Sequence, residues 1–223
     1  QLNIIYASID KFSIITPTFR RDIVLSHYLH RYAVELPKKM GELHKIYIIW
    51  MNIDRKPELS PIIMAEKSKW KVGVEFIVPP KNDLNFRFVV PKNLETEAVM
   101  SLDDDLIMNP EDIRKAFFAW KLKWNGSVAP IIGFYPRDYS YNSKGELVYS
   151  FFTENHYSMI LTGACFLSKK FLVLYNDGNL KEAVAIRRFV SQNMNAEDIG
   201  MNFLVAAFFP SLPPIWIKGV EIK

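Results

Sequence analysis

Three consecutive aspartates, Asp103 to Asp105, are the residues whose type and spacing most directly suggest chemistry. They follow the apolar run 98–102, which is typical of a buried strand, and aspartate is depleted in strands, so the strand should end there. The carboxyl ends of strands form the ligand-binding edge of an open α/β sheet. Because Mg²⁺ and Mn²⁺ favour carboxylate oxygens and often bridge to nucleotide phosphates, we predict a divalent ion held by Asp105, with Asp103 nearer the nucleoside. A solvated acidic turn ahead of a helix at Pro110 would explain the same run.

A second carboxylate pair, Glu197 and Asp198, comes shortly before an apolar segment, 201–208, that we expect to be helical. Two acidic side chains at that point could serve a reaction centre. They could equally complement the positive end of the helix dipole, which is a sufficient structural explanation. The residues alone leave both interpretations open.

Two arginines, Arg20 and Arg21, occupy the loop between the first expected strand, 12–16, and a helix expected at 23–33. A loop arginine that faces a helix N-terminus suits a phosphate group or a uracil carbonyl. A solvated surface side chain is the better explanation for Arg20.

Three further polar residues stand beside apolar segments. Asn52 follows the second expected strand, 45–50, and so belongs at the same sheet edge as the aspartates. An amide at that edge could read the edge of a base or cap a turn. Asn82 and Arg87 come after a third expected strand, 71–78, in an otherwise apolar neighbourhood.

The alternation of strands and helices in the first half of the chain predicts an α/β fold, with a mostly parallel sheet and right-handed crossovers. A helix should begin at Pro110, because proline is favoured at the first helical position. The second half is expected to be richer in strands. Its expected elements are strands at 128–135, 147–153, 157–161 and 215–217, a polar turn at 137–145, and helices at 180–190 and 201–208.

The composition argues against several classes of protein. Hydrophobic residues make up 49% of the 223 residues, and the formal net charge of +4 is spread along the chain without a basic run. We therefore expect a sizeable core and no nucleic-acid partner. The single cysteine, Cys165, rules out an intrachain disulfide and is expected to be a buried apolar side chain. No apolar run reaches membrane-spanning length, and no signal peptide opens the sequence.

Three blocks of sequence, taken in order, resemble one family, the exostosin-type glycosyltransferases of glycosyltransferase family 64. Residues 102–105, Leu-Asp-Asp-Asp, resemble the D-x-D motif of the family. Residues 155–164, Asn-His-Tyr-Ser-Met-Ile-Leu-Thr-Gly-Ala, resemble its D-Y-S-M-V-L-T-G-A block. Residues 195–205, Asn-Ala-Glu-Asp-Ile-Gly-Met-Asn-Phe-Leu-Val, resemble its N-C-E-D-I-x-M-N-F-L-V block.

The resemblance implies a GT-A fold in a single domain over 1–223. A Rossmann-like nucleotide-sugar-binding half, at about 1–110, would be fused to a more β-rich acceptor and catalytic half, at about 111–223. It implies a UDP-sugar-dependent hexosaminyltransferase that transfers a sugar, typically N-acetylglucosamine, to a glycan or glycolipid acceptor with retention of configuration. Mn²⁺ would be the cofactor, with Mg²⁺ as the alternative ion. The family also implies the lumen of the Golgi or endoplasmic reticulum and membrane association only through a segment outside this chain, and a homodimer is one assembly open to it.

The resemblance also assigns roles to single residues. Contacts to the uridine diphosphate part of the donor fall to Arg21, Asn52, Asn82 and Arg87. Asp103 and Asp104 should contact ribose or sugar, and Asp105 should hold the metal. Asp198, with Glu197 beside it, should face the anomeric carbon of the donor sugar.

The sequence departs from the family pattern at four places. Pro17 stands where animal members can have glutamine, Leu106 replaces a threonine, and Ala196 replaces a cysteine. The sequence ends at Lys223, before the segment in which relatives carry an arginine that binds the diphosphate. The alternative function is therefore a nucleotide-sugar-binding domain with little or no turnover.

Overall fold

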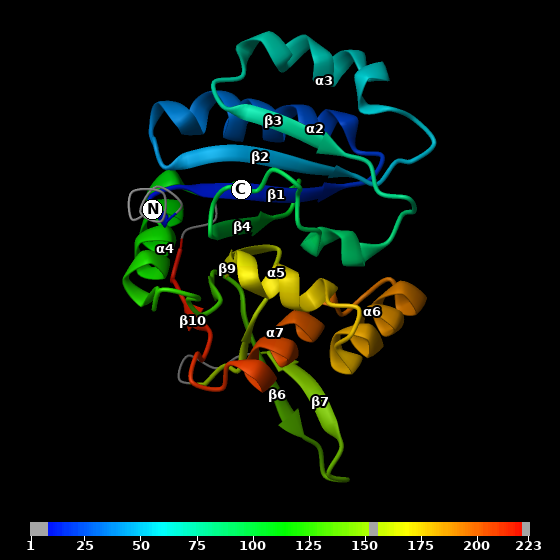
Figure 1. Ribbon diagram of the computed structural model, residues 1–223, viewed down its shortest axis with the longest axis vertical. Coiled ribbons are helices and arrows are strands. Elements are labelled where there is room, and N and C mark those ends of the chain that lie inside the picture. The colour runs from blue at the N-terminus through cyan, green and yellow to red at the C-terminus, as the bar shows by residue number, and fades with distance from the viewer. Residues whose placement is uncertain (1–8, 152–155, 220–223) are drawn as a thin grey trace.

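The computed structural model describes residues 9–151 and 156–219, and a seven-stranded sheet with the order β10-β5-β9-β4-β1-β2-β3 forms its centre (Figure 1). The strands are β1 Phe12–Thr18, β2 Leu43–Trp50, β3 Gly73–Ile77, β4 Ala98–Leu102, β5 Ile132–Gly133, β9 Ala164–Ser168 and β10 Ile215–Trp216. Parallel pairs join β1 to β2 and β4, β2 to β3, and β5 to β10. Strand β9 runs antiparallel between β4 and β5. The predicted α/β fold with a mostly parallel sheet is confirmed.

Helices cover both faces of this sheet. They are α2 Asp22–Leu29, α3 Pro61–Glu66, α4 Pro110–Lys123, α5 Lys169–Asn176, α6 Lys181–Asn193 and α7 Glu197–Phe208. One buried cluster contains side chains of α2 and α4, and a second contains side chains of α5 and α7. Among the helices of the described residues, none is long and apolar enough to cross a bilayer.

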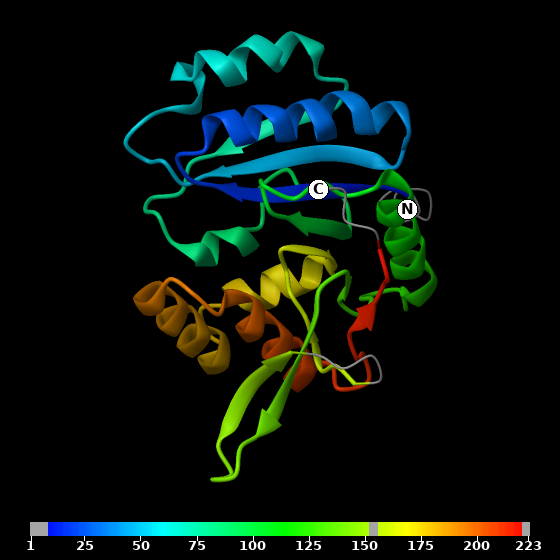
Figure 2. The ribbon, with the colours of Figure 1, turned by 180° about the vertical axis from the view of Figure 1, so that it is seen from behind.

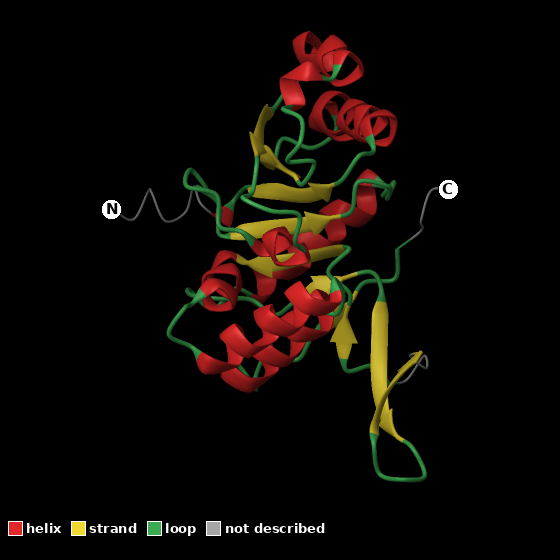
Figure 3. Ribbon diagram, turned by 90° about the vertical axis from the view of Figure 1, so that its right-hand side faces the viewer, coloured by secondary structure: helices red, strands yellow, loops and turns green. Residues whose placement is uncertain are grey.

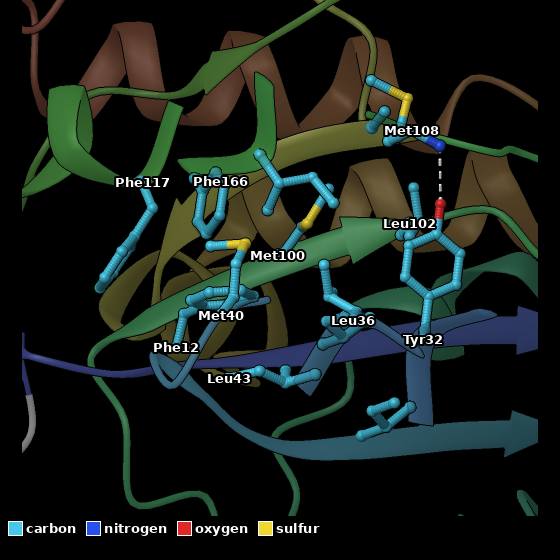
Figure 4. Packing of buried hydrophobic residues seen from close by; sticks show 14 of the residues in the cluster. Phe12, Tyr32, Leu36, Met40, Leu43, Met100, Leu102, Met108, Phe117 and Phe166 are labelled. Carbon is cyan, nitrogen blue, oxygen red and sulfur yellow. Dashed lines mark hydrogen bonds between the residues drawn. The ribbon is translucent and has the colours of Figure 1, made fainter. Parts of the chain in front are cut away.

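The two buried clusters arise from the period of two in the central strands. Successive side chains of a strand point to opposite faces, so Ile14 belongs to the first cluster and Ile15 to the second. Figure 4 shows the first cluster, in which the rings of Phe12 and Phe117 lie 5.0 Å apart between centroids. Burying each such side chain contributes about 1.5–3 kcal/mol, which anchors the strands whose ends form the site.

A second sheet is ordered β7-β6-β8, and its β6–β7 hairpin projects away from the body of the molecule as a narrow arm (Figures 2 and 3). Its strands are β6 Pro136–Tyr141, β7 Leu147–Phe151 and β8 Met159–Ile160. The expectation of a polar turn over 137–145 was wrong. Tyr139 lies opposite Tyr149 in the antiparallel ladder, and such aromatic pairs stabilise a hairpin. The turn is confined to the tip, where Gly145 has a φ of 75°.

Two other sequence expectations differ from the structure. The strand expected at 128–135 is restricted to β5, because Pro130 has no N–H for a ladder and the backbone of Ala129 is bonded to the side chain of Ser168. Helix α5 was not expected from the sequence. It is stabilised by burial of Phe171 and Tyr175 against the sheet.

We predict that Gly200→Ala destabilises the protein. A Cβ at Gly200 in α7 would lie 2.4 Å from Cγ2 of Ile186 in α6, and overpacking of this kind costs about 1–3 kcal/mol. That loss exceeds the gain of about 1 kcal/mol expected for glycine to alanine in an unhindered helix. The measurement is the free energy of unfolding in denaturant.

Gly178→Ala is the matched control, because nothing lies within 4 Å of a Cβ built there. Its free energy of unfolding should change little. A Gly200→Ala protein as stable as the wild type would show that α6 and α7 can move apart without loss of packing.

Candidate active site

The carboxyl ends of β1, β2 and β4 border a cleft of about 370 Å³. The cleft brings together most of the residues predicted from the sequence, namely Arg21, Asn82, Arg87, Asp103, Asp104 and Asp105. The same edge was expected from the strand pattern, because parallel strands present their carboxyl ends together. Its remaining lining residues are Pro17, Thr18, Phe19, Met51, Leu84 and Met194.

Asp104 is the inward-facing member of the aspartate run. Its side chain is buried, and its two oxygens accept hydrogen bonds from Oγ1 of Thr18 at 2.7 Å and from Nη1 of Arg21 at 3.0 Å. Burial raises the pKa of Asp104, and the bond from Thr18 opposes this rise. Asp104 is therefore held by protein groups, and it anchors Arg21 at the mouth of the cleft.

Asp105 is half-exposed and accepts a hydrogen bond from Nη1 of Arg21 at 2.8 Å. Arg21 thus bridges Asp104 and Asp105, and the Asp104 carboxylate raises the pKa of Arg21 above its ordinary value. Of the three aspartates, Asp105 offers the most exposed carboxylate to a ligand in the cleft.

Asp103 is joined to the second half of the chain through Arg87. The Arg87 side chain is 9% exposed, with Nη1 lying 2.5 Å from Oδ1 of Asp103 and Nε lying 3.2 Å from Oε1 of Glu197. Burial lowers the pKa of Arg87, but the carboxylates of Asp103 and Glu197 outweigh burial and raise it. Gly163 allows this arrangement, since a Cβ there would lie 2.6 Å from Oδ2 of Asp103.

Glu197 and Asp198 occupy the first turn of α7. Burial raises the pKa of both carboxyl groups, and the positive charge of Arg87 opposes the rise in each. Oδ1 of Asp198 accepts a hydrogen bond from the backbone N–H of Ile199 at 2.7 Å. Glu197 is thus linked to Asp103 through Arg87, while neither Glu197 nor Asp198 is among the residues that line the cleft.

Asn52, like Glu197 and Asp198, is not among the residues that line the cleft. It is buried and borders a neighbouring hollow of about 750 Å³, together with Arg20, Arg21 and Arg55. Its backbone oxygen accepts a hydrogen bond from Nε1 of Trp50 at 2.9 Å. Arg20 lies at the surface and pairs with Asp54 at 3.0 Å.

Strained backbone is concentrated near these residues. Within the described ranges, the non-glycine residues with positive φ are Arg20 at 54°, Met194 at 49° and Ala196 at 69°. Left-handed conformations cost about 1–2 kcal/mol for a residue with a Cβ, and such strain gathers at functional sites. Ala196 directly precedes Glu197, so its left-handed conformation sets the direction in which α7 begins.

Thr18 and Met194 are site residues that the sequence reasoning missed. Thr18 bonds Asp104, and Met194 lines the cleft from the end of α6. The strand–loop pattern placed Thr18 beside the site without indicating its partner. No local signal marked Met194, because its place depends on how α6 packs.

The residues fit a divalent ion that is held partly by the protein and partly by the phosphates of a bound substrate. Among residues 9–151 and 156–219, no three His, Cys, Asp or Glu side chains converge as a ready-made metal centre. Mg²⁺-like ions, however, are often bound through one or two carboxylates together with substrate phosphates. Asp105, an exposed oxygen donor at the mouth of the cleft, has the chemistry for this role.

Comparisons with known proteins bear on this site. Residues 12–223 match the sequence model described as "Glycosyl transferase family 64 domain". The chain is 35% identical over 212 residues to an exostosin-like-3 homolog from Caenorhabditis elegans, covering 92% of this chain and 23% of that protein. It is 29% identical over 222 residues to glycosylinositol phosphorylceramide mannosyl transferase 1 from Arabidopsis thaliana, covering 93% of this chain and 63% of that protein. The chain thus spans less than two thirds of each of these relatives.

The structure also resembles a solved glycosyltransferase. The mannosyltransferase PcManGT from Pyrobaculum calidifontis, solved in complex with GDP-Man and Mn²⁺, superimposes with a TM-score of 0.56 at 9% sequence identity, covering 96% of this chain and 56% of that one. At this identity the likeness concerns the fold alone, which is of the GT-A type. The match over residues 12–223 shows that the chain belongs to glycosyl transferase family 64, the exostosin-type glycosyltransferases.

Proposed function

We propose that this chain is a retaining glycosyltransferase that transfers a sugar, N-acetylglucosamine by preference, from a UDP-sugar to a glycan or glycolipid acceptor. The observation that carries the proposal is the buried Arg87, which lies between the aspartate run at the end of β4 and the carboxylate pair of α7. A diphosphate bound at Arg87 would then lie next to acidic groups that could act on the sugar attached to it.

The donor half of the cleft suits a nucleoside diphosphate. Arg21 and Arg87 would stabilise the negative charge that develops on the diphosphate as the sugar leaves. Asn82, at the cleft wall, would contact the uridine diphosphate, and Asp103 would contact ribose or sugar. Asn52 would reach the base from the neighbouring hollow, and Asp104 would act mainly by holding Arg21.

We propose Mn²⁺ as the cofactor, with Mg²⁺ as the alternative, held by Asp105 and the donor phosphates. When bound, such an ion neutralises charge on the leaving diphosphate. Asp105 contributes a half-exposed carboxylate and Arg21 a neighbouring positive charge.

The two carboxylates of α7 are proposed to divide their work. Glu197 pairs with Arg87 and so holds the guanidinium in place. Asp198 would face the anomeric carbon, either as a nucleophile or as a stabiliser of an oxocarbenium-like state. Retention of configuration follows from a covalent intermediate, or from attack on the same face with the leaving diphosphate as base.

The cellular setting is proposed from the relatives. We place the protein in the lumen of the Golgi or endoplasmic reticulum, attached to the membrane through a segment outside this chain, with a homodimer as one assembly. The name of the Arabidopsis relative includes a phosphorylceramide, which supports a glycolipid among the acceptors to be tested.

UDP binding should require a divalent ion. Asp105 and the diphosphate each offer oxygen donors that repel one another without a cation between them. Calorimetry with UDP in Mn²⁺ and in EDTA is the measurement, and affinity should fall at least tenfold in EDTA, or about 1.4 kcal/mol. Equal affinity in both conditions would contradict the metal site. UDP binding with no hydrolysis of any UDP-sugar would instead favour the binding domain without turnover.

Arg87→Lys should weaken UDP binding about tenfold or more, because a charge-assisted contact contributes about 1.5–3 kcal/mol. Lysine keeps the buried positive charge between Asp103 and Glu197, so the variant should remain folded. The measurement is UDP affinity in Mn²⁺ by calorimetry. Arg114→Lys is the matched control, since Arg114 pairs with Glu111 on α4 and lines neither the cleft nor the neighbouring hollow, and its UDP affinity should stay near that of the wild type.

Asp198→Asn should reduce turnover by a factor of hundreds or more, about 3–4 kcal/mol in the barrier, as expected when one preorganised charge-stabilising group is lost. UDP affinity should be almost unchanged. The melting temperature should hold or rise at neutral pH, because burial raises the pKa of Asp198 and the charged form is therefore disfavoured in the folded state. The measurements are donor hydrolysis and a thermal melt on both proteins.

The pH dependence has a defined sign. A carboxyl group with a raised pKa stabilises the fold below its unfolded-state pKa, and this contribution is lost as the pH rises through its folded-state pKa. In Asp198→Asn, the part of the fall in stability with rising pH that comes from Asp198 should therefore be absent. Glu182→Gln, in the first turn of α6, is the control for an exposed helix-start carboxylate. Normal turnover with a lowered melting temperature in Asp198→Asn would reduce Asp198 to a helix-start charge.

A further inference from the structure

A buried carboxylate outside the cleft, Asp83, stands at the start of the turn that carries Arg87. This turn is the 3₁₀ segment Leu84–Phe88, and Asp83 is 2% exposed. Its Oδ1 accepts hydrogen bonds from the backbone N–H of Asn85 and from Nδ2 of Asn85, each at 2.9 Å. Asp83 therefore caps the turn and fixes its first residues.

The other oxygen of Asp83 faces α6. Oδ2 accepts a hydrogen bond from Oγ of Ser191 and pairs with Nζ of Lys81 at 2.7 Å. Burial alone would raise the pKa of Asp83, but the bonds from Lys81 and Ser191 lower it below its ordinary value. The group is therefore a charged anchor between the turn and the helix.

Asn85 extends this anchor to two helices. Its Nδ2 lies 2.9 Å from the backbone oxygen of Arg187 and 3.0 Å from Oγ of Ser191, both on α6, so its two hydrogens are shared among these acceptors and Asp83. Its Oδ1 accepts a hydrogen bond from the hydroxyl of Tyr175, on α5, at 2.6 Å. A buried network in which the members satisfy one another in this way is rigid.

Helix α6 connects this network to Met194, which lines the cleft, and to the start of α7. The helix ends at Asn193, Met194 is the next residue, and α7 begins at Glu197. Gly200 of α7 packs closely against Ile186 of α6. A shift of the turn relative to α6 would therefore separate Arg87 from Glu197.

We infer that Asp83, Asn85 and Ser191 are positioning residues that hold Arg87 and Asn82 in register with the carboxylate pair of α7. The inference rests on the proposed UDP-sugar site. Asp83, Asn85 and Ser191 are not among the residues that line the cleft, so they act on the donor through the turn. A network that merely stabilises the fold would leave donor affinity unchanged in a folded variant.

Ser191→Ala tests the inference at a distance from the ligand. UDP affinity in Mn²⁺ should fall about tenfold, the lower end of what losing an outer-shell partner costs at metal sites, when measured by calorimetry well below both melting temperatures. Gln192→Ala, an exposed neighbour on α6, is the matched control and should bind UDP as the wild type does. Asp83→Asn, which keeps an oxygen to cap the turn, should weaken UDP binding in the same direction.

A double variant shows where Ser191 acts. If the effect passes through Arg87, Ser191→Ala added to Arg87→Lys should change UDP affinity less than twofold, because residues coupled through a shared backbone shift are not additive. Full additivity would overturn the inference, as would wild-type UDP affinity in folded Ser191→Ala.

A readout without nucleotide separates this inference from the proposed function. The ¹⁵N–¹H resonance of the Arg87 Nε group, identified by its loss in Arg87→Lys, should shift in Ser191→Ala and not in Gln192→Ala. Failure of the wild type to bind UDP would remove the proposed function, while the Arg87 signal would still report positioning. An Arg87 resonance unmoved by Ser191→Ala would overturn the inference.

Discussion

The structure of the site depends on one buried guanidinium. Arg87 pairs with Asp103 at the end of β4 and with Glu197 at the start of α7, so a single side chain links the aspartate run to the carboxylate pair. A buried ion pair contributes little net stability when complete, but removing one partner costs about 3–5 kcal/mol because the other charge is left unpaired. Loss of any one of the three side chains would therefore leave a buried charge without its partner. The three lie where the first and second halves of the chain come into contact.

The same concentration of buried charge lowers the stability of the folded protein. Burial raises the pKa values of Asp104, Glu197 and Asp198, so each is held in a setting that disfavours its charged form. The left-handed backbone of Ala196 adds strain directly before Glu197. Stability is commonly sacrificed for groups placed in this way at functional sites.

The sheet topology explains why distant segments meet. Strand β9 runs antiparallel between β4 and β5, which brings the preceding Gly163 beside Asp103, and the N–H of Asp103 donates to the oxygen of Gly163 at 2.8 Å. A side chain at Gly163 would press on the carboxylate of Asp103. The GT-A fold of this family member thus places a backbone segment, rather than a side chain, against the first aspartate of the run.

The sequence by itself determined the strands β1, β2 and β4 and the presence of aspartates at the end of β4, because apolar runs and the turn residues that end them are local signals. It also determined the start of α4 at Pro110 and, through three blocks of residues, the family. Only the tertiary structure decided that Asp104 faces inward, that Asn52 lies in a separate hollow, and that Arg87 pairs with Glu197. These features depend on contacts between segments far apart in the chain, which the spacing of residues along the sequence does not predict. For the same reason α5 and β6 were missed: burial of α5 side chains in the second cluster and cross-strand pairing of β6, rather than local propensity, settled their conformation.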